Sequence, residues 1–240
     1  MELPVEGISV PVDMALSNKF NCLYITESSK HRVWKITLSS PENKVEVWLD
    51  SGAGDPFTLS VTNDGRVVMV KRGSPPSLDI YDPDAKLLLP LNLPTPMLKP
   101  NHAVETSKGN LIVSYDSVIV ARVQAGICEI TKAGQIISRF DTTFESINGV
   151  AENVNTLLAR LGGKNLFGFK YLAIDDKDQV YACSDGTDGL ICLDSRLKLE
   201  TTIRKDELNC PVRVQYVRQE SQLIVVDTQH PNLVFILKAK

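Results

Sequence analysis

One short pattern recurs five times along this chain of 240 residues. Its plainest copy, KPNHAVETSKGNLIVSYD, runs from Lys99 to Asp116. A proline opens a short apolar segment, a polar turn with glycine follows, and a second apolar segment ends at an acidic residue. Two short apolar segments that flank a turn of Gly, Asn, Asp or Ser are typical of a β-hairpin. The chain is therefore predicted to be built from repeated hairpins.

The spacing of the copies predicts the kind of repeat protein. The other four copies occupy residues 8–28, 55–72, 169–185 and 210–228. Aligned on the residue two places after the proline, the five copies form a column of equivalent residues: Asp13, Thr58, His102, Tyr171 and Arg213. Successive members of this column lie 45, 44, 69 and 42 residues apart. A strand-only repeat of about 40–45 residues is typical of a β-propeller, and each copy would be one blade.

The segments after the first copy complete a blade. RVWKIT (Arg32–Thr37) and KVEVWL (Lys44–Leu49) read as two further strands, and four short strands make one propeller blade. We therefore predict an all-β propeller that fills residues 1–240 as a single domain, with five recognisable blades and five or six in total. The last copy lacks a fourth strand, and Met1–Pro4 is expected to supply it, because an exposed sheet edge is a liability.

The step of 69 residues marks an insertion at residues 141–168. Within it, apolar residues recur at helical spacing, which predicts one amphipathic helix near 147–161; they are Ile147, Val150, Val154, Leu157, Leu158 and Leu161. Three interpretations stay open for this segment: a surface excursion packed on a blade, a lid or partner-binding helix, and a degenerate sixth blade.

The column residues are the candidate functional site. They stand at the entry of each innermost strand, and innermost strands line the central channel of a propeller. We therefore expect Asp13, Thr58, His102, Tyr171 and Arg213 to converge on one mouth of the channel and to bind a ligand or partner. The alternative is a structural polar plug in which Asp13 pairs with Arg213.

Catalytic and cofactor motifs are missing from the sequence. The chain has no Gly-x-Ser-x-Gly element, and of its three histidines only His102 stands in the column. His31 and His230 fall in loops of other repeats, so no spacing joins the three as metal ligands. Neither a metal nor another cofactor is expected.

Bulk composition limits the partners. Twenty-six basic and 29 acidic residues give a net charge of −3, which makes a nucleic-acid partner or an anionic membrane surface an unfavourable choice. No stretch is apolar enough for a membrane-spanning helix. Five cysteines without zinc-site spacing, and the lack of any Asn-x-Ser/Thr sequon, favour a cytoplasmic protein. An extracellular domain of a larger protein stays open as the alternative.

Two segments carry a family resemblance. YITESSKHRVWKI (Tyr24–Ile36) and VVDTQHPNLVFIL (Val225–Leu237) resemble the repeat of NHL propellers, in which an acidic residue after the second strand precedes an Asn-x-Arg element. The chain looks most like uncharacterised invertebrate NHL-like proteins and, more distantly, like the C-terminal propellers of tripartite-motif ubiquitin ligases. Two departures stand out: Arg72 and Ser184 replace the acidic residue in two repeats, and the Asn-x-Arg element is complete nowhere.

The resemblance and the residues together give three functional hypotheses. The first is a non-catalytic module that recognises a protein partner, with a small-molecule ligand in the central channel as a further option. The second is a metal-dependent hydrolase or lyase of the gluconolactonase-like propeller kind. The related lyases use several channel histidines, and this chain has one. The third is an RNA-binding NHL domain, which the charge balance does not favour.

Overall fold

The computed structural model describes residues 7–239 apart from 28, 39–42, 51–54, 73–74, 95–96, 98, 120–121, 144–166, 186–189, 204–207, 209–210 and 228–233. These residues are almost entirely β-structure, and their only helical element is the single turn η1 (Arg218–Glu220). They group into two compact units, residues 1–93 and 94–240. Within this described part of the chain, no helix has the length and apolar character needed to cross a membrane.

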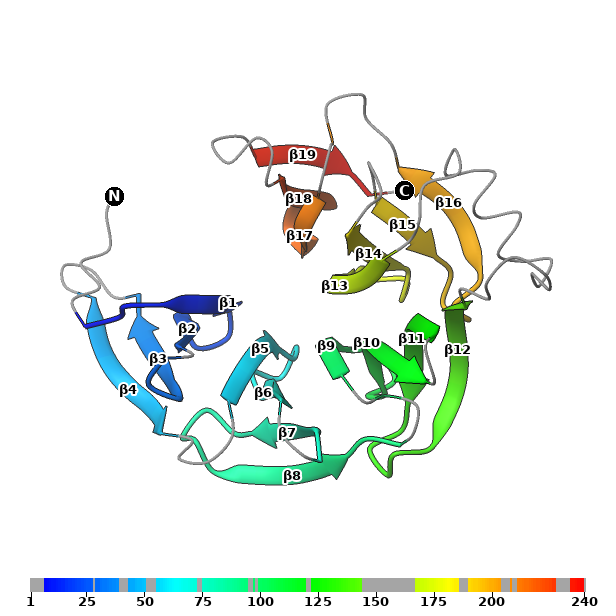
Figure 1. The fold of residues 1–240 in the computed structure, drawn as a ribbon. Coiled ribbons are helices and arrows are strands. Elements are labelled where there is room, and N and C mark those ends of the chain that lie inside the picture. Colours follow the sequence, from blue (N-terminus) through cyan, green and yellow to red (C-terminus); the bar gives the residue numbers. More distant parts are fainter. Residues whose placement is uncertain are drawn as a thin grey trace. The chain divides into compact units, whose positions relative to one another are not determined.

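The first unit holds two antiparallel four-stranded sheets (Figure 1). In each sheet the strands lie in chain order, so that every strand pairs with the one before it. Blade one consists of β1 (Pro11–Ser17), β2 (Cys22–Glu27), β3 (Arg32–Thr37) and β4 (Lys44–Asp50). Blade two consists of β5 (Asp55–Val61), β6 (Val67–Arg72), β7 (Ser77–Tyr81) and β8 (Leu87–Asn92).

The second unit holds three sheets of the same up-and-down topology. Blade three consists of β9 (Lys99–Glu105), β10 (Leu111–Ile119), β11 (Arg122–Ile130) and β12 (Ile136–Thr143). Blade four consists of β13 (Phe167–Ile174), β14 (Val180–Asp185), β15 (Leu190–Leu193) and β16 (Leu199–Ile203). Blade five has three described strands, β17 (Pro211–Val217), β18 (Gln222–Asp227) and β19 (Val234–Lys238).

The predicted all-β architecture of consecutive antiparallel blades is confirmed, and the five repeats correspond to the five sheets. The insertion is shorter than predicted at both ends, because 141–143 belong to β12 and 167–168 to β13. The predicted helix near 147–161 and the strand expected from Met1–Pro4 lie outside the described residues. A sixth blade and the single domain of 1–240 stay predictions.

The same local hydrogen bond stabilises six of the hairpin turns. At each, a Thr or Asp side-chain oxygen accepts the backbone N–H four residues later at 2.8–3.1 Å, which satisfies a donor that the turn would otherwise leave open. Short polar side chains at this place stabilise the turn without a partner from elsewhere in the fold. The six residues are Thr62, Asp82, Thr106, Thr131, Asp175 and Asp194.

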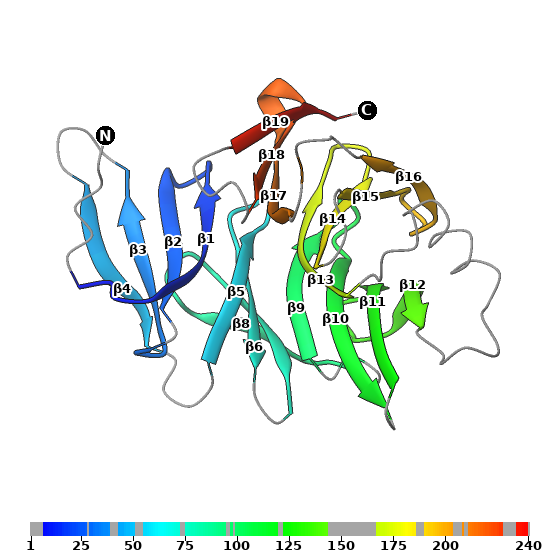
Figure 2. The same cartoon turned by 45° about the horizontal axis from the view of Figure 1, so that its top comes forward.

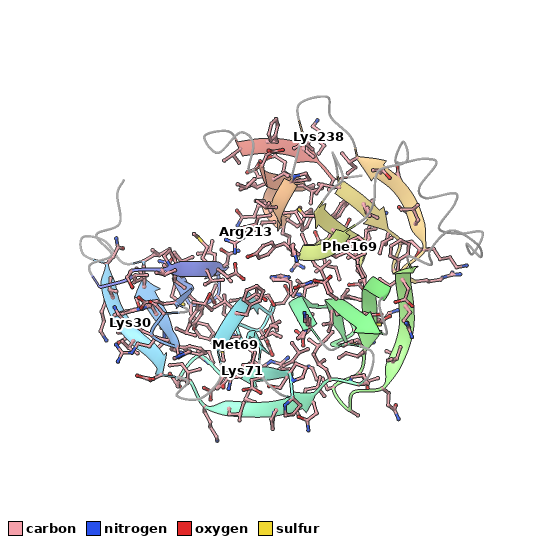
Figure 3. The ribbon with its side chains drawn as sticks, in the orientation of Figure 1. Lys30, Met69, Lys71, Phe169, Arg213 and Lys238 are labelled. Atoms are coloured by element: carbon pink, nitrogen blue, oxygen red, sulfur yellow. The ribbon has the colours of Figure 1, made fainter. Side chains whose placement is uncertain are left out.

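Apolar residues of neighbouring blades pack together inside each unit. In the first unit, Tyr24 and Val33 of blade one share a buried cluster with Leu59 and Met69 of blade two. In the second unit, one cluster joins blades three and four and another joins blades four and five. Such packing is required because a lone blade cannot bury both of its faces. Figure 3 labels Met69 and Phe169, two fully buried residues of blades two and four.

Blade three carries an extended hairpin. The pairing of β10 with β11 continues beyond Asp116 through Ser117, Val118 and Ile119, which lie opposite Gln124, Val123 and Arg122. β9 pairs with β10 only as far as Asp116, so the tip of the hairpin extends beyond β9 (Figure 2). The described residues between Asp116 and Gly126 therefore extend the hairpin of β10 and β11.

Candidate recognition site

The five column residues occupy the same position in all five blades. In each first strand a β-bulge precedes the column residue, and the column residue then lies opposite an equivalent residue of the second strand. The five cross-strand pairs are Asp13–Thr26, Thr58–Val70, His102–Ser114, Tyr171–Cys183 and Arg213–Val226. Bulges bend a strand and redirect a side chain. The repeat register read from the sequence is therefore the register of the strands.

In the second unit, three of these side chains form a stacked row from three successive blades. The guanidinium carbon of Arg213 lies 4.6 Å from the ring centroid of Tyr171. The Tyr171 ring in turn lies 5.4 Å from the His102 ring, at an interplanar angle of 53°. Both distances are within the range of favourable cation–π and aromatic contacts. Figure 3 labels Arg213 on β17.

The backbone of blade four orients the histidine. The Leu172 N–H donates to Nδ1 of His102 at 3.4 Å. In a neutral imidazole this leaves Nε2 as the nitrogen that carries the proton. His102 is buried, and its own backbone N–H donates to the Ser114 hydroxyl at 3.2 Å. The row therefore combines a cation, an N–H donor and a phenol on a fixed backbone.

Burial lowers the pKa of the Arg213 guanidinium below its ordinary value. Arginine nevertheless keeps its charge at neutral pH, because its ordinary pKa lies above about 12. Because Arg213 is partly shielded from water, its charge interacts more strongly with its surroundings than the charge of a fully exposed arginine would.

In the first unit, Asp13 joins two blades. Its Oδ2 accepts the Leu59 N–H of β5 at 2.9 Å, and its Oδ1 accepts the Met14 N–H at 2.7 Å. Its own backbone N–H donates to the Thr26 hydroxyl at 2.9 Å. Asp13 and Thr58 are both buried, and the Asp13 carboxylate joins β1 to β5. The convergence of all five residues on one mouth, and the pairing of Asp13 with Arg213, stay predictions.

A second polar group beside the row was not expected from the sequence. Asn101, the bulge residue of β9, donates from Nδ2 to the Phe169 carbonyl at 3.2 Å and to Oδ2 of Asp116 at 3.1 Å. The same carboxylate oxygen lies 3.5 Å from the Lys170 ammonium, on the bulge of β13. These contacts tie blade three to blade four next to His102 and Tyr171. Asn101, the polar residue one place before His102, was the only sign of these contacts in the sequence.

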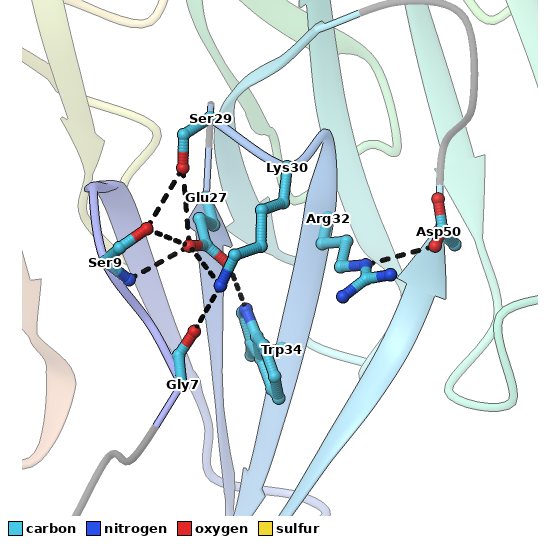
Figure 4. Close-up of polar contacts among 8 residues, drawn as sticks. All are labelled: Gly7, Ser9, Glu27, Ser29, Lys30, Arg32, Trp34 and Asp50. Carbon is cyan, nitrogen blue, oxygen red and sulfur yellow. Dashed lines mark hydrogen bonds and ion pairs between the residues drawn. The ribbon is translucent and has the colours of Figure 1, made fainter.

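The residue after the second strand proves to be an internal anchor. Glu27 is fully buried and accepts the Ser9 N–H at 2.9 Å, the Ser9 hydroxyl at 2.7 Å and Nε1 of Trp34 at 2.7 Å (Figure 4). Burial alone would raise the pKa of its carboxyl, but these bonds and the Lys30 ammonium lower it to about 2. Glu27 therefore joins the residues before β1 to the β3 strand.

The strand register also corrects one sequence assignment. Glu27 lies opposite Pro11, Ser184 opposite Phe169 and Asp227 opposite Pro211. The equivalent partner of Pro56 is Lys71, so the assignment of Arg72 to this position was wrong by one residue. Lys71 pairs with Asp79 of the same blade at 2.6 Å. In blade two, the position thus keeps a charged residue with a partner, although the acidic residue has been replaced.

The described residues include no group of three or more His, Cys, Asp or Glu side chains that could hold a metal ion. The stacked row brings one imidazole, one phenol and one guanidinium together. This set can donate hydrogen bonds and stack on a flat group.

The five consecutive antiparallel sheets make this chain a β-propeller, and comparison with solved structures supports that class. A chain of the nidogen/laminin complex matches with a TM-score of 0.67 and 15% identity, over 96% of this chain and 76% of that chain. A virginiamycin B lyase from Staphylococcus aureus matches with a TM-score of 0.55 and 13% identity, over 97% and 71%. Kuenenia stuttgartiensis hydrazine synthase matches with a TM-score of 0.60 and 13% identity, over 95% and 83%.

At these identities the likeness concerns the fold alone. No protein-family model matches the chain, and no curated protein matches it.

Proposed function

We propose that this chain is a non-catalytic recognition module on an NHL-like propeller and that it binds a protein partner at the stacked row of His102, Tyr171 and Arg213. The observation that carries the proposal is the row itself. Three blades bring a cation, a ring and a second ring into contact at one repeat position. Rigid scaffolds that present a few oriented side chains are a common design for recognition.

The residue types in the row suit a protein partner. Tyr and Arg are enriched among the residues that dominate the affinity of protein interfaces. Here the stacking of Arg213 on Tyr171 holds the guanidinium in place before any partner arrives, which reduces the entropy lost on binding. The row offers donors and one positive charge, so the contacting segment of the partner is expected to be acidic or rich in acceptors.

Two further observations are consistent with this proposal. The matched solved structures include a chain of the nidogen/laminin complex, a protein–protein assembly by its name. The column position itself is held by backbone bulges rather than by mobile loops. We further propose a cytoplasmic setting for the protein, on the grounds of its cysteine pattern and lack of sequons.

Affinity capture tests the proposal. Immobilised wild-type protein and the variants Tyr171→Ala and Leu88→Ala would be incubated with the same cell extract. Leu88 is an exposed residue of β8, so Leu88→Ala is a control that removes a large side chain outside the stacked row. We expect a partner that wild type and Leu88→Ala retain and that Tyr171→Ala loses, although all three proteins unfold at similar temperatures.

A different outcome would favour another function. Capture that does not depend on Tyr171 would show that the stacked row is not the binding site. Turnover of a lactone in the presence of Ca²⁺ or Zn²⁺ that is lost in Asp13→Ala would favour the hydrolase hypothesis over the recognition proposal.

A further inference from the structure

Two joints between neighbouring blades use the same repeat positions. In the first unit, Oδ2 of Asp13 accepts the N–H of Leu59, the residue that follows the column residue of blade two, at 2.9 Å. In the second unit, Nδ1 of His102 accepts the N–H of Leu172, the residue that follows the column residue of blade four, at 3.4 Å. At both joints, a column side chain is therefore the acceptor for a backbone donor of the next blade.

Both joints are buried. The acceptor residues Asp13 and His102 are 3% and 7% exposed, and the donor residues Leu59 and Leu172 are each 2% exposed. A buried backbone N–H that loses its acceptor is costly, because water does not reach it to replace the hydrogen bond. Each joint therefore depends on a side chain that keeps accepting a hydrogen bond.

The two acceptors respond differently to acid. A carboxyl group has an oxygen that can accept a hydrogen bond whether or not the group is protonated. A cationic imidazole carries a proton on both nitrogens, so its Nδ1 becomes a donor and can no longer accept the Leu172 N–H. Histidine is also the side chain that ordinarily gains its charge in the mildly acidic range. The chemistry of the joint at His102 is therefore acid-sensitive, whereas that of the joint at Asp13 is not.

The charged groups around the imidazole act in the same direction. Titratable and charged side chains of four neighbouring strands lie around it: Tyr171 and Lys170 of β13, Arg213 of β17, Asp116 of β10 and Glu129 of β11. The two carboxylates already accept hydrogen bonds from other side chains. A cationic His102 would contact the same Tyr171 ring as the Arg213 guanidinium, which places a second positive charge on the stacked row.

We propose that the joint between blades three and four is an acid-sensitive switch, in which protonation of His102 releases the Leu172 N–H and separates the stacked row. Leu172 also belongs to the apolar cluster that joins these two blades, so the blades stay together while the row opens. The row is then complete at neutral pH and open in mild acid. This switch is a property of the joint, and it does not depend on the function proposed above.

Nuclear magnetic resonance tests the switch without a binding partner. In protein that contains isotope-labelled histidine, the ring signals show which nitrogen carries a proton. The chain has three histidines, and the variants His31→Asn and His230→Asn identify the signals of the other two. Hydrogen exchange of the Leu172 amide, expressed as protection relative to an unfolded chain at the same pH, measures the joint. The Leu59 amide, which Asp13 accepts, is the matched control joint.

His102→Asn provides the control variant. The side-chain oxygen of asparagine is the same number of bonds from the backbone as Nδ1 of histidine, so it can accept the Leu172 N–H. The asparagine amide does not titrate, and the variant therefore keeps the joint but removes its sensitivity to acid.

At about pH 7.5 we expect a neutral His102 ring with its proton on Nε2 and a protected Leu172 amide. As the ring gains its second proton toward about pH 5, the protection of Leu172 should fall at least about tenfold, whereas that of Leu59 should change less than about twofold. In His102→Asn, neither amide should lose protection.

Three results in the wild type would overturn the proposal: a proton on Nδ1 at neutral pH, a ring that stays neutral down to about pH 5, and protection of Leu172 that survives protonation of the ring. An equal loss of Leu172 protection in His102→Asn would overturn it as well, because the acid sensitivity would then belong to another group.

Discussion

Replacement of Glu27 by glutamine probes the anchor that holds the start of blade one. The carboxylate accepts two hydrogen bonds from Ser9 and one from Trp34, and Lys30 lies 3.4 Å away. Glutamine keeps the shape but loses the charge, and its amide nitrogen would face donors. Because Glu27 is fully buried, solvent cannot replace the lost interactions.

The pKa of Glu27 gives the magnitude. A fall from 4.5 to about 2 corresponds to roughly 3 kcal/mol of preference for the charged form in the folded protein. Lys30 is 42% exposed, so water screens its share, and we expect Glu27→Gln to lower the free energy of unfolding by about 2 kcal/mol at neutral pH. The control Glu46→Gln removes a partly exposed pair with Lys44 and should cost less than about 0.5 kcal/mol.

The pH dependence provides the sharper test. A carboxyl whose pKa is lowered on folding stabilises the protein above its unfolded pKa of 4.5, and this contribution is lost as the pH falls toward 2. Between pH 6.5 and pH 4.0, wild type should therefore lose about 0.8 kcal/mol that Glu27→Gln does not lose. Urea unfolding followed by far-ultraviolet circular dichroism at both pH values would measure the difference. Equal pH dependence in the two proteins would refute the assignment of this anchor.

Three further predictions concern other buried groups. Tyr115→Phe removes the hydroxyl that donates to Asp141 and should lower the free energy of unfolding by about 1–2 kcal/mol, measured by urea unfolding; an unchanged midpoint would contradict it. Burial raises the pKa of the Cys128 thiol to about 11, so iodoacetamide at pH 8 should leave Cys128 unmodified in the folded protein, and rapid labelling detected by mass spectrometry would show that the site is open. His102→Ala should weaken binding of the captured partner at least about tenfold while the melting temperature changes little, and a large loss of stability with unchanged affinity would make His102 structural.

Much of the fold could be predicted because the same pattern of strands and turns occurs five times in the sequence. Each copy placed apolar strands and turn residues at the same offsets, so the errors of one copy were corrected by the others. The turn residues were readable too, since Thr62 or Asp175 stabilises its turn with its own side chain and needs no distant partner. The column from Asp13 to Arg213 was correct in register for the same reason.

The side-chain contacts between strands and between blades could not be predicted from the sequence. The bulge before each column residue adds one unpaired residue, and this shift hid the equivalence of Lys71 with Glu27. The partners of Glu27 were also hidden, because Ser9 lies 18 residues away and Trp34 on another strand. Asn101 and Asp116 look like ordinary loop and turn residues in the sequence, although they join two blades.

Photocrosslinking from the stacked row tests the recognition function most directly. A photoreactive phenylalanine would replace Tyr171 in one protein and Phe20, a partly exposed residue of the first unit, in a control. After irradiation in cell extract, we expect one dominant protein crosslinked from position 171 and absent from position 20, with crosslinked peptides of the partner rich in acidic residues. Crosslinks of equal strength from both positions, or none from position 171 to a partner that the wild type captures, would contradict it.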